Sequence, residues 1–251
     1  MSTPRSVAVV GATGGAGATR LVVETAAVLA RDGRDVAVFD AAFATQRLAQ
    51  YVPGDVDVDA TRLLTDDAVA PSESLVDLDV DAPGRVAACP VRASFTELAD
   101  AKTADAAERF DAVVRETADA FDHVLVDVPP VAANQHVAAV TATDRVAVVA
   151  PDGRRGADAL PRVRDRLRDL DAAAPGDLVV ANRVDDPPVV ADPAVAVPES
   201  DVVDPTDTPV SDTATGAFPS AVAALAERAF DVELDVDLEP TGVTARLFGA
   251  E

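Results

Sequence analysis

The sequence has few of the residues that build redox, metal or membrane sites. Its 251 residues include one cysteine, Cys89, which excludes an intrachain disulfide and a cysteine-built metal cage. The two histidines, His123 and His136, have no cysteine neighbours, so no structural zinc site is expected. No apolar run approaches the roughly 20 residues that cross a bilayer, and the N-terminal residues lack the layout of a signal peptide. We therefore expect a soluble, cytoplasmic protein without a membrane partner.

Positive charge is scarce, and almost all of it is arginine. The chain carries 44 acidic residues against 21 basic ones, a net charge of −23, and Lys102 is its single lysine. The carboxylates are mostly aspartate and are spread along the whole chain, a bias typical of proteins from salt-accumulating halophiles. At about 1 M salt the Debye length falls to about 3 Å, so such a surface is screened. The same acidity disfavours binding to a phosphate backbone, and we do not expect DNA as a partner.

The N-terminal part of the chain has the pattern of a βαβ unit. Apolar residues make up 49% of the sequence, which excludes general disorder. Residues 6–10 form a β-branched run that ends in a glycine cluster at 11–17. A helical stripe of apolar residues follows over 21–29, and residues 34–40 then predict a second strand that ends on an aspartate. This order of elements predicts a parallel sheet.

The rest of the chain continues the same α/β pattern. Further strands are predicted at 85–88, 121–128, 144–150 and 177–181. Further helices are predicted at 97–120, 160–170 and 220–229, with a weak candidate at 60–64. Residues 185–217 have the composition of a long loop, and the acidic residues 231–251 form either a tail or an edge strand. No repeat or linker divides the sequence, so we expect one domain over residues 1–251.

The glycine cluster is the strongest candidate for a binding site. A glycine-rich turn between a strand and a helix exposes backbone N–H groups to an anion, although a tight turn alone also uses glycines. Residues 13–19 (TGGAGAT) resemble the deviant phosphate loop of the ParA/MinD family of P-loop ATPases, Lys-Gly-Gly-x-Gly-Lys-Thr. The glycine spacing also fits the dinucleotide loop of short-chain dehydrogenase relatives. Asp40 fits both patterns, beside magnesium or on a ribose hydroxyl.

Four further segments, in the family's order, decide between the two patterns. Residues 124–130 (VLVDVPP) resemble the Walker B strand and switch of the ParA/MinD family, and residues 142–151 resemble its next strand. Residues 179–183 (VVANR) resemble its adenine-contacting Asn-Arg, and residues 197–199 (VPE) resemble its loop over the base. A reductase needs a Tyr-x-x-x-Lys pair, and Tyr51 and Lys102 are far apart in the sequence. The chain is identified as a degenerate ParA/MinD-like protein.

The resemblance implies a fold, a cofactor and a set of site residues. The implied fold is a three-layer α/β structure, a mostly parallel twisted sheet flanked by helices, with the site at the carboxyl ends of the strands. The implied cofactor is ATP or ADP with Mg²⁺, for which Thr19, Asp40 and Asp127 are the metal-site residues. The full set of implied nucleotide-binding residues is Gly14, Gly15, Gly17, Thr19, Asp40, Asp127, Asn182, Arg183, Pro198 and Glu199.

The same resemblance exposes missing catalytic groups. The family's signature lysine falls on Thr13, its phosphate-loop lysine on Ala18, and the second aspartate after the second strand on Ala42. A charge-assisted hydrogen bond is worth roughly 1.5–3 kcal/mol, and phosphoryl transfer depends on such contacts. We therefore assign no catalytic residue and expect lost or very weak ATP hydrolysis. Whether the chain is an enzyme stays open, and Thr13 cannot reach across a nucleotide-bound dimer as the signature lysine does.

Three functions compete at this point. The first is a nucleotide switch or scaffold in spatial organisation, which positions chromosomes, plasmids, division proteins or surface machinery through protein partners, as a homodimer or with an intact homologue. The second is a weak ATPase that uses non-standard residues. The third is an NAD(P)-binding Rossmann-like protein without reductase residues.

Three weaker features have plainer interpretations. Six arginines between residues 154 and 168 alternate with aspartates, which predicts a solvated, salt-bridged helix face. His136 follows the Pro-Pro segment and is expected at the surface. Arg20, one position past Thr19, is expected to point away from a phosphate.

Overall fold

A computed structural model describes residues 3–170, 178–185 and 187–239. Its centre is one eight-stranded sheet with the strand order β3-β4-β2-β5-β1-β6-β7-β8. Every neighbouring pair is parallel except β3 and β4. The strands are β1 (Ser6–Gly11), β2 (Asp35–Asp40), β3 (Val76–Asp77), β4 (Arg85–Cys89), β5 (His123–Val128), β6 (Arg145–Pro151), β7 (Leu178–Asn182) and β8 (Val195–Val197).

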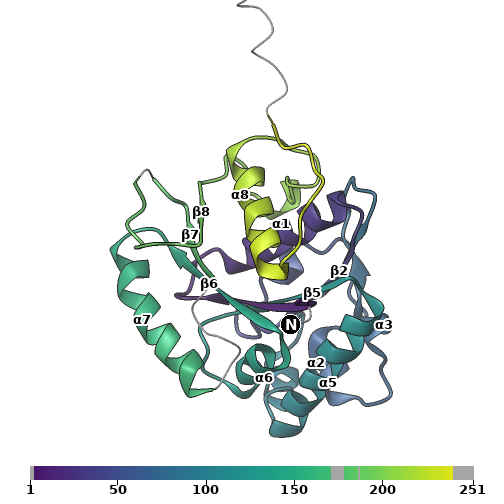
Figure 1. Cartoon of the computed structure of the whole chain (residues 1–251). Coiled ribbons are helices and arrows are strands. Elements are labelled where there is room, and N and C mark those ends of the chain that lie inside the picture. Colours follow the sequence, from purple (N-terminus) through teal and green to yellow (C-terminus); the bar gives the residue numbers. More distant parts are fainter. Residues whose placement is uncertain (1–2, 171–177, 186, 240–251) are drawn as a thin grey trace, which may run out of the picture.

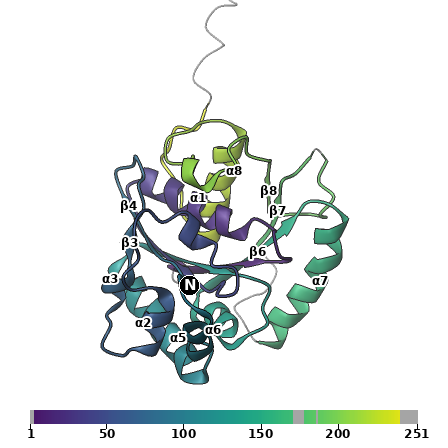
Figure 2. The same cartoon turned by 180° about the vertical axis from the view of Figure 1, so that it is seen from behind.

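Helices cover both faces of this sheet (Figure 1). One face carries α1 (Ala18–Arg31) and α8 (Ala217–Phe230), which lie together above the strands. The other face carries α2 (Ala60–Thr65), α3 (Pro71–Ser74), α4 (Phe95–Asp100), α5 (Ala104–Ala120), α6 (Asn134–Ala142) and α7 (Arg154–Asp169). The view from behind shows the same two layers (Figure 2). The predicted three-layer α/β fold is confirmed, and no helix of the described residues is long and apolar enough to cross a bilayer.

Burial on both faces explains the composition of the central strands. Strands β1, β5 and β6 consist mainly of valine and alanine, and nearly all of their residues are buried. Near-continuous apolar runs of this kind are characteristic of parallel strands that helices cover on both sides. Phe39 and Phe110 meet edge to face beneath the sheet, with ring centroids 6.3 Å apart. Leu21, Leu29 and Phe230 fill the opposite layer against α1 and α8.

The strand order places the glycine loop at the middle of one sheet edge. The chain leaves β1 through α1 and reaches β2 on one side, whereas β5 leads through α6 to β6 on the other side of β1. Ligands of open α/β sheets bind at such a switch point, outside the carboxyl ends of the strands. Asp40 is the last residue of β2, Asp127 lies near the end of β5, and Asn182 is the last residue of β7. The topology therefore brings all three toward the same edge of the sheet.

Some predicted elements differ in the structure. The predicted helix 97–120 is two helices, because the Thr103 side chain accepts a hydrogen bond from the Ala106 amide and caps α5 as a new helix. The predicted loop 185–217 contains β8 and the short 3-10 helix η2 (Pro205–Asp207), and a further 3-10 helix, η1, spans Leu48–Gln50. Helix α6 was not predicted, since its weak apolar stripe and missing side-chain cap leave little signal.

Residues 231–239 do not form the edge strand that was one of the two expectations for residues 231–251. Asp231 ends α8 in a left-handed conformation (φ 56°), and residues 232–239 then run as an extended segment outside the sheet. Their aliphatic side chains are half-buried against the α1 and α8 layer, while the intervening carboxylates are exposed. The Arg31 guanidinium and Gly216 amide bond to carbonyls of this segment. The alternating aliphatic side chains of this segment therefore pack on the helices. Residues 240–251, the rest of the segment expected as a tail or an edge strand, lie outside the described residues.

Candidate functional site

The glycine loop joins the end of β1 to the start of α1. Gly15 and Gly17 have φ values of 78° and 89°, which side-chain-bearing residues rarely adopt. Gly17 is also closely approached, since a Cβ atom there would lie 2.2 Å from the amide nitrogen of Asn182. The first turn of α1 contains no acidic residue. Its free N–H groups therefore present uncompensated positive charge to the loop.

The loop forms the floor of a cavity of about 430 Å³, a volume typical of small-molecule sites. Nine of the ten predicted site residues line it, namely Gly14, Gly15, Gly17, Thr19, Asp127, Asn182, Arg183, Pro198 and Glu199. The exception is Asp40, which is fully buried behind Asp127. Thr13, Ala18 and Ala42, where the resemblance places the missing family residues, also line the cavity, and the Thr13 hydroxyl is buried without a hydrogen-bond partner among the described residues.

Thr19 and the two aspartates form one connected group. The Thr19 hydroxyl donates to Asp127 Oδ2 over 2.6 Å. Asp40 lies opposite Asp127 in the register of β2 and β5 and accepts hydrogen bonds from the amides of Ala42 and Val91. Asp40 and Asp127 thus lie at neighbouring strand ends and Thr19 in the first turn of α1, but only Thr19 and Asp127 line the cavity.

Burial brings the two aspartates toward their neutral forms. Desolvation, reinforced by the nearby Asp127 charge, raises the pKa of Asp40 from 3.8 to about 8. Desolvation also raises the pKa of Asp127 to about 6, against the opposing effects of the Thr19 hydrogen bond and the Arg47 charge. Near neutral pH Asp40 therefore keeps its proton, whereas Asp127 is mostly ionised and is the carboxylate available to a cation.

Asn182 and Arg183 hold the loop from the end of β7. The Asn182 amide donates to the Ala16 carbonyl over 2.9 Å and accepts a bond from the Arg183 backbone N–H. Arg183 has a φ of 60°, and its guanidinium donates to the Gly15 carbonyl over 3.4 Å. The Asn182 side chain, implied by resemblance to contact a base, is thus engaged by the glycine loop.

The cavity is more positive than the chain as a whole. Its charged lining residues are three arginines (Arg20, Arg47 and Arg183) and two carboxylates (Asp127 and Glu199). In the complete sequence carboxylates outnumber basic residues by 44 to 21. The local excess of positive charge suits an anionic ligand.

The segment after β2 is the part of the site that the sequence did not predict. Thr45, Arg47, Gln50 and Tyr51 line the cavity opposite Arg183. They follow the end of a strand, where many α/β proteins place their binding residues. This position was the one feature of the sequence that could have indicated a role in the site. Turn-rich composition alone does not tell which of these side chains face a ligand.

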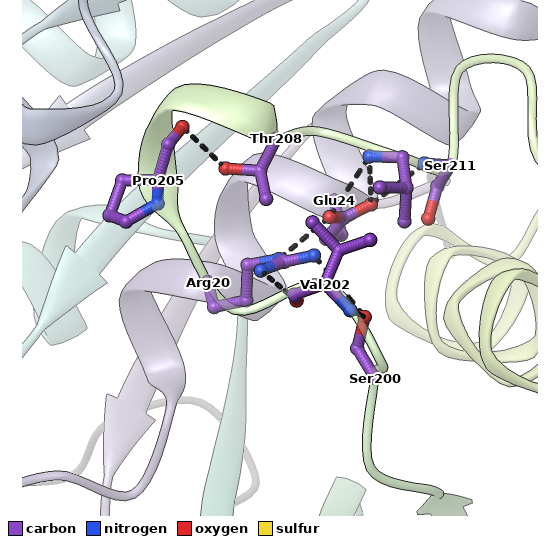
Figure 3. Close-up of polar contacts among 8 residues, drawn as sticks. Arg20, Glu24, Ser200, Val202, Pro205, Thr208 and Ser211 are labelled. Atoms are coloured by element: carbon purple, nitrogen blue, oxygen red, sulfur yellow. Dashed lines mark hydrogen bonds and ion pairs between the residues drawn. The ribbon is translucent and has the colours of Figure 1, made fainter.

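Residues 198–211, which we call the strap, form another wall of the cavity and are fastened to α1 (Figure 3). Glu24 is fully buried and accepts hydrogen bonds from the amides of Val210 and Ser211 over 3.1 and 2.8 Å. Arg20 pairs with Glu24 over 2.7 Å and donates to the Val202 carbonyl over 3.0 Å. As expected, Arg20 points toward the strap, away from the glycine loop.

His136 is buried, contrary to the expected surface position. Its Nδ1 accepts a hydrogen bond from the Ala132 amide over 3.1 Å, and burial lowers its pKa to about 4. The side chain was misplaced because α6 itself was not predicted. Cys89 is buried in the core, as expected for a residue that ends an apolar strand.

The residues present fit a magnesium–nucleotide site only in part. Among the described residues, no group of three or more His, Cys, Asp or Glu side chains could hold a metal. Mg²⁺ is commonly bound through one or two carboxylates together with substrate phosphates and water. Thr19 and Asp127 satisfy this reduced requirement, because their side-chain oxygens adjoin at the cavity wall.

No protein-family model matches the sequence, and no curated protein matches it significantly. Solved structures do match. MinD complexed with Mg-ADP from Pyrococcus horikoshii is 18% identical with a TM-score of 0.75, covering 89% of this chain and 95% of its own. A chain of the MinC:MinD cell division protein complex of Aquifex aeolicus is 20% identical with a TM-score of 0.71, and the match covers 93% of this chain and 98% of that chain.

A ParA family ATPase from Chlorobium tepidum is 15% identical with a TM-score of 0.67, covering 79% of this chain and 85% of its own. At such identities the likeness concerns the fold alone. The mostly parallel eight-stranded sheet flanked by helices agrees with it. The chain therefore has the fold of the ParA/MinD-like P-loop ATPases.

Proposed function

We propose that this protein is a ParA/MinD-like nucleotide switch or scaffold that has lost most or all ATP hydrolysis. The observation that carries the proposal is a mixed site. The glycine loop, Thr19 and Asp127 are assembled around one cavity, while Thr13 and Ala18 occupy the positions of both family lysines. Such a site keeps the parts that bind a phosphate and lacks those that stabilise the transition state.

Nucleotide binding is supported by the loop geometry and the local charge. Backbone N–H groups at the start of α1 and the positive lining of the cavity both favour a phosphate. We propose ATP or ADP as the ligand, with Thr19 and Asp127 holding Mg²⁺ and the buried Asp40 behind them. When bound, the metal would neutralise phosphate charge, a contribution that this protein needs more than a relative with two lysines.

Weak or absent hydrolysis follows from three replacements at the cavity wall. Thr13 and Ala18 cannot carry positive charge, and Ala42 cannot align a water molecule. Each lost charged contact removes roughly 1.5–3 kcal/mol of stabilisation. The weak-ATPase alternative has one observation in its favour, the retained contact between Thr19 and Asp127.

The cellular role that we propose is spatial organisation, through a protein partner. The fold neighbours include a septum site-determining protein and one that is complexed with MinC. We propose positioning of chromosomes, plasmids, the division site or surface machinery, by a homodimer or by a heterodimer with an intact homologue. We further propose that the chain acts as one cytoplasmic domain in a salt-rich cell, where its acidic surface is screened.

A thermal-shift titration tests the nucleotide proposal. ATP, ADP and NAD are compared with and without Mg²⁺, at a KCl concentration above about 1 M to screen the acidic surface. A ligand at a hundred times its Kd stabilises by about 2.7 kcal/mol, which for this length raises Tm by several degrees. A magnesium-dependent shift with ATP supports the proposal. A shift with NAD alone that disappears in Asp40→Ala would favour the dinucleotide alternative.

A phosphate-release assay on the same preparation separates switch from enzyme. We expect release at the level of a blank. Release above the blank that is lost in Asp127→Ala would contradict the loss of hydrolysis and establish the weak ATPase. No thermal shift with any nucleotide would refute nucleotide binding.

A further inference from the structure

We propose that arginines from three separate elements replace the two missing lysines as the source of positive charge at the glycine loop. This inference rests on the proposed function and names the groups that recognise the polyphosphate. Arg47 and Arg183 would contact the anion, and Arg155 would position the loop. The ligand class is a nucleoside di- or triphosphate, recognised through its phosphates.

Arg155 and Arg183 act on two consecutive carbonyls of the loop. The Arg155 guanidinium, at the start of α7, donates to the Gly14 carbonyl over 3.1 Å. The Arg183 guanidinium, just past β7, donates to the Gly15 carbonyl over 3.4 Å. Two guanidinium groups that follow neighbouring strands thus bind the carbonyls of the same turn. The N–H groups of that turn stay available to a ligand. Arg183 lines the cavity and Arg155 does not, which separates a contact role from a positioning role.

Arg47 approaches from the opposite wall. It lines the cavity from the segment after β2, and its side chain is exposed. Within residues 3–170, 178–185 and 187–239 it forms no hydrogen bond or ion pair with a side chain or carbonyl. Its charge reaches the buried carboxylate of Asp127, where it favours the ionised form. An unpaired guanidinium beside the cavity is available to an incoming anion.

Arginine is chemically suited to this replacement. A guanidinium presents several N–H donors in a plane and binds phosphate oxygens in pairs, which a lysine ammonium does not. It also remains charged at every physiological pH. The chain contains a single lysine, Lys102, so arginine is nearly its sole source of fixed positive charge. Arg20 is not part of the proposed set, because Glu24 and the strap engage its guanidinium.

Binding measurements on charge-neutral variants test the inference. AMP, ADP, ATP and inorganic tripolyphosphate are titrated into wild type, Arg47→Gln, Arg183→Gln and Arg155→Gln at one fixed KCl concentration. Arg162→Gln is the matched control, because Arg162 is an exposed residue of α7 outside the cavity. We expect Arg47→Gln and Arg183→Gln each to weaken ATP and tripolyphosphate binding about tenfold, the value of one charged contact. The effect should shrink from ATP through ADP to AMP.

The Arg155 variant has a different expected result. A positioning residue should weaken all phosphate-bearing ligands by a similar factor and increase hydrogen exchange at the loop amides, whereas Arg47→Gln should leave that exchange unchanged. If ATP binds and all three variants match Arg162→Gln, the arginine proposal is refuted and the proposed function stands. If tripolyphosphate binds through the arginines but ATP does not, the proposed function fails and the arginine site stands. If neither ligand binds wild type, both are refuted.

Discussion

Replacing Glu24 tests whether a single buried carboxylate fastens the strap to α1. Its side chain is fully buried, pairs with Arg20 over 2.7 Å and accepts two strap amides over 3.1 and 2.8 Å (Figure 3). Alanine at this position leaves Arg20 without its partner and two amides without acceptors. Breaking a buried ion pair in this way costs about 3–5 kcal/mol. For a chain of this length the expected fall in Tm is on the order of 10 °C.

Glutamine gives a graded version of the same test. It keeps the shape and one acceptor oxygen but turns an NH₂ group toward existing donors, so we expect Glu24→Gln to cost about 1–3 kcal/mol. Thermal and urea unfolding measure both variants, with Glu108→Ala as the control because Glu108 is exposed on α5. Hydrogen exchange at the amides of Val210 and Ser211 should accelerate in Glu24→Ala. Stability within about 0.5 kcal/mol of the control, with unchanged exchange, would refute the reasoning.

Three further perturbations have expected outcomes at the site. Because the pKa of Asp40 is raised to about 8 in the folded protein, the folded state keeps a proton that the unfolded chain releases, so the free energy of unfolding should fall as pH rises from about 4 to 8. Asp127, whose pKa is raised to about 6, contributes to the same fall, so Asp40→Asn should reduce that slope in urea titrations at pH 5 and pH 8, and an unchanged slope would contradict the assignment. Gly17→Ala combines positive φ with a 2.2 Å clash and should lower Tm and abolish nucleotide binding, whereas Gly33→Ala, with φ 82° and open space, should show backbone strain alone. Thr19→Val removes a hydrogen bond to the Asp127 carboxylate, so the pKa of Asp127 should rise above about 6, as carbonyl-carbon NMR would detect.

The sequence predicted the sheet and most of the cavity wall for one physical reason. Parallel strands that are buried on both faces have near-continuous apolar runs, and such runs are visible without a structure. Their carboxyl ends meet at one edge, so the polar residues that terminate them are brought together by topology alone. Asp127 and Asn182 lie at such strand ends, whereas Thr19 lies in the first turn of α1; all three were implied by the resemblance to the ParA/MinD family. Asp40 was implied in the same way, but its complete burial in β2, between β4 and β5, has no local signature.

The residues that the sequence missed are those placed by tertiary approach. Arg155 belongs to a helix whose alternating charges predict a solvated face, and two of its ion pairs, Arg154–Asp158 and Arg168–Asp165, form as predicted. Arg155 itself turns the other way, because α7 begins directly beside the glycine loop. Arg47 lies in an irregular segment whose path no periodicity describes. The distance in sequence between positions 47 and 155 conceals that both residues lie near the glycine loop and its cavity.

The distribution of charge around the loop bears on the proposal that this protein lacks the two lysines of the ParA/MinD family. Drift after loss of function removes positive charge without replacing it, and in a chain with 44 acidic residues it would leave a negative cavity. This cavity is lined by three arginines against two carboxylates, and a fourth arginine holds the Gly14 carbonyl. Glu24 already pairs with Arg20, but among the described residues Arg47, Arg155 and Arg183 form no ion pair with a carboxylate, so their charge is available to an anion. The arrangement therefore supports the proposed phosphate-binding site. In that proposal, the arginines retain the attraction for phosphate that the family lysines supply, whereas the contribution of those lysines to hydrolysis is absent.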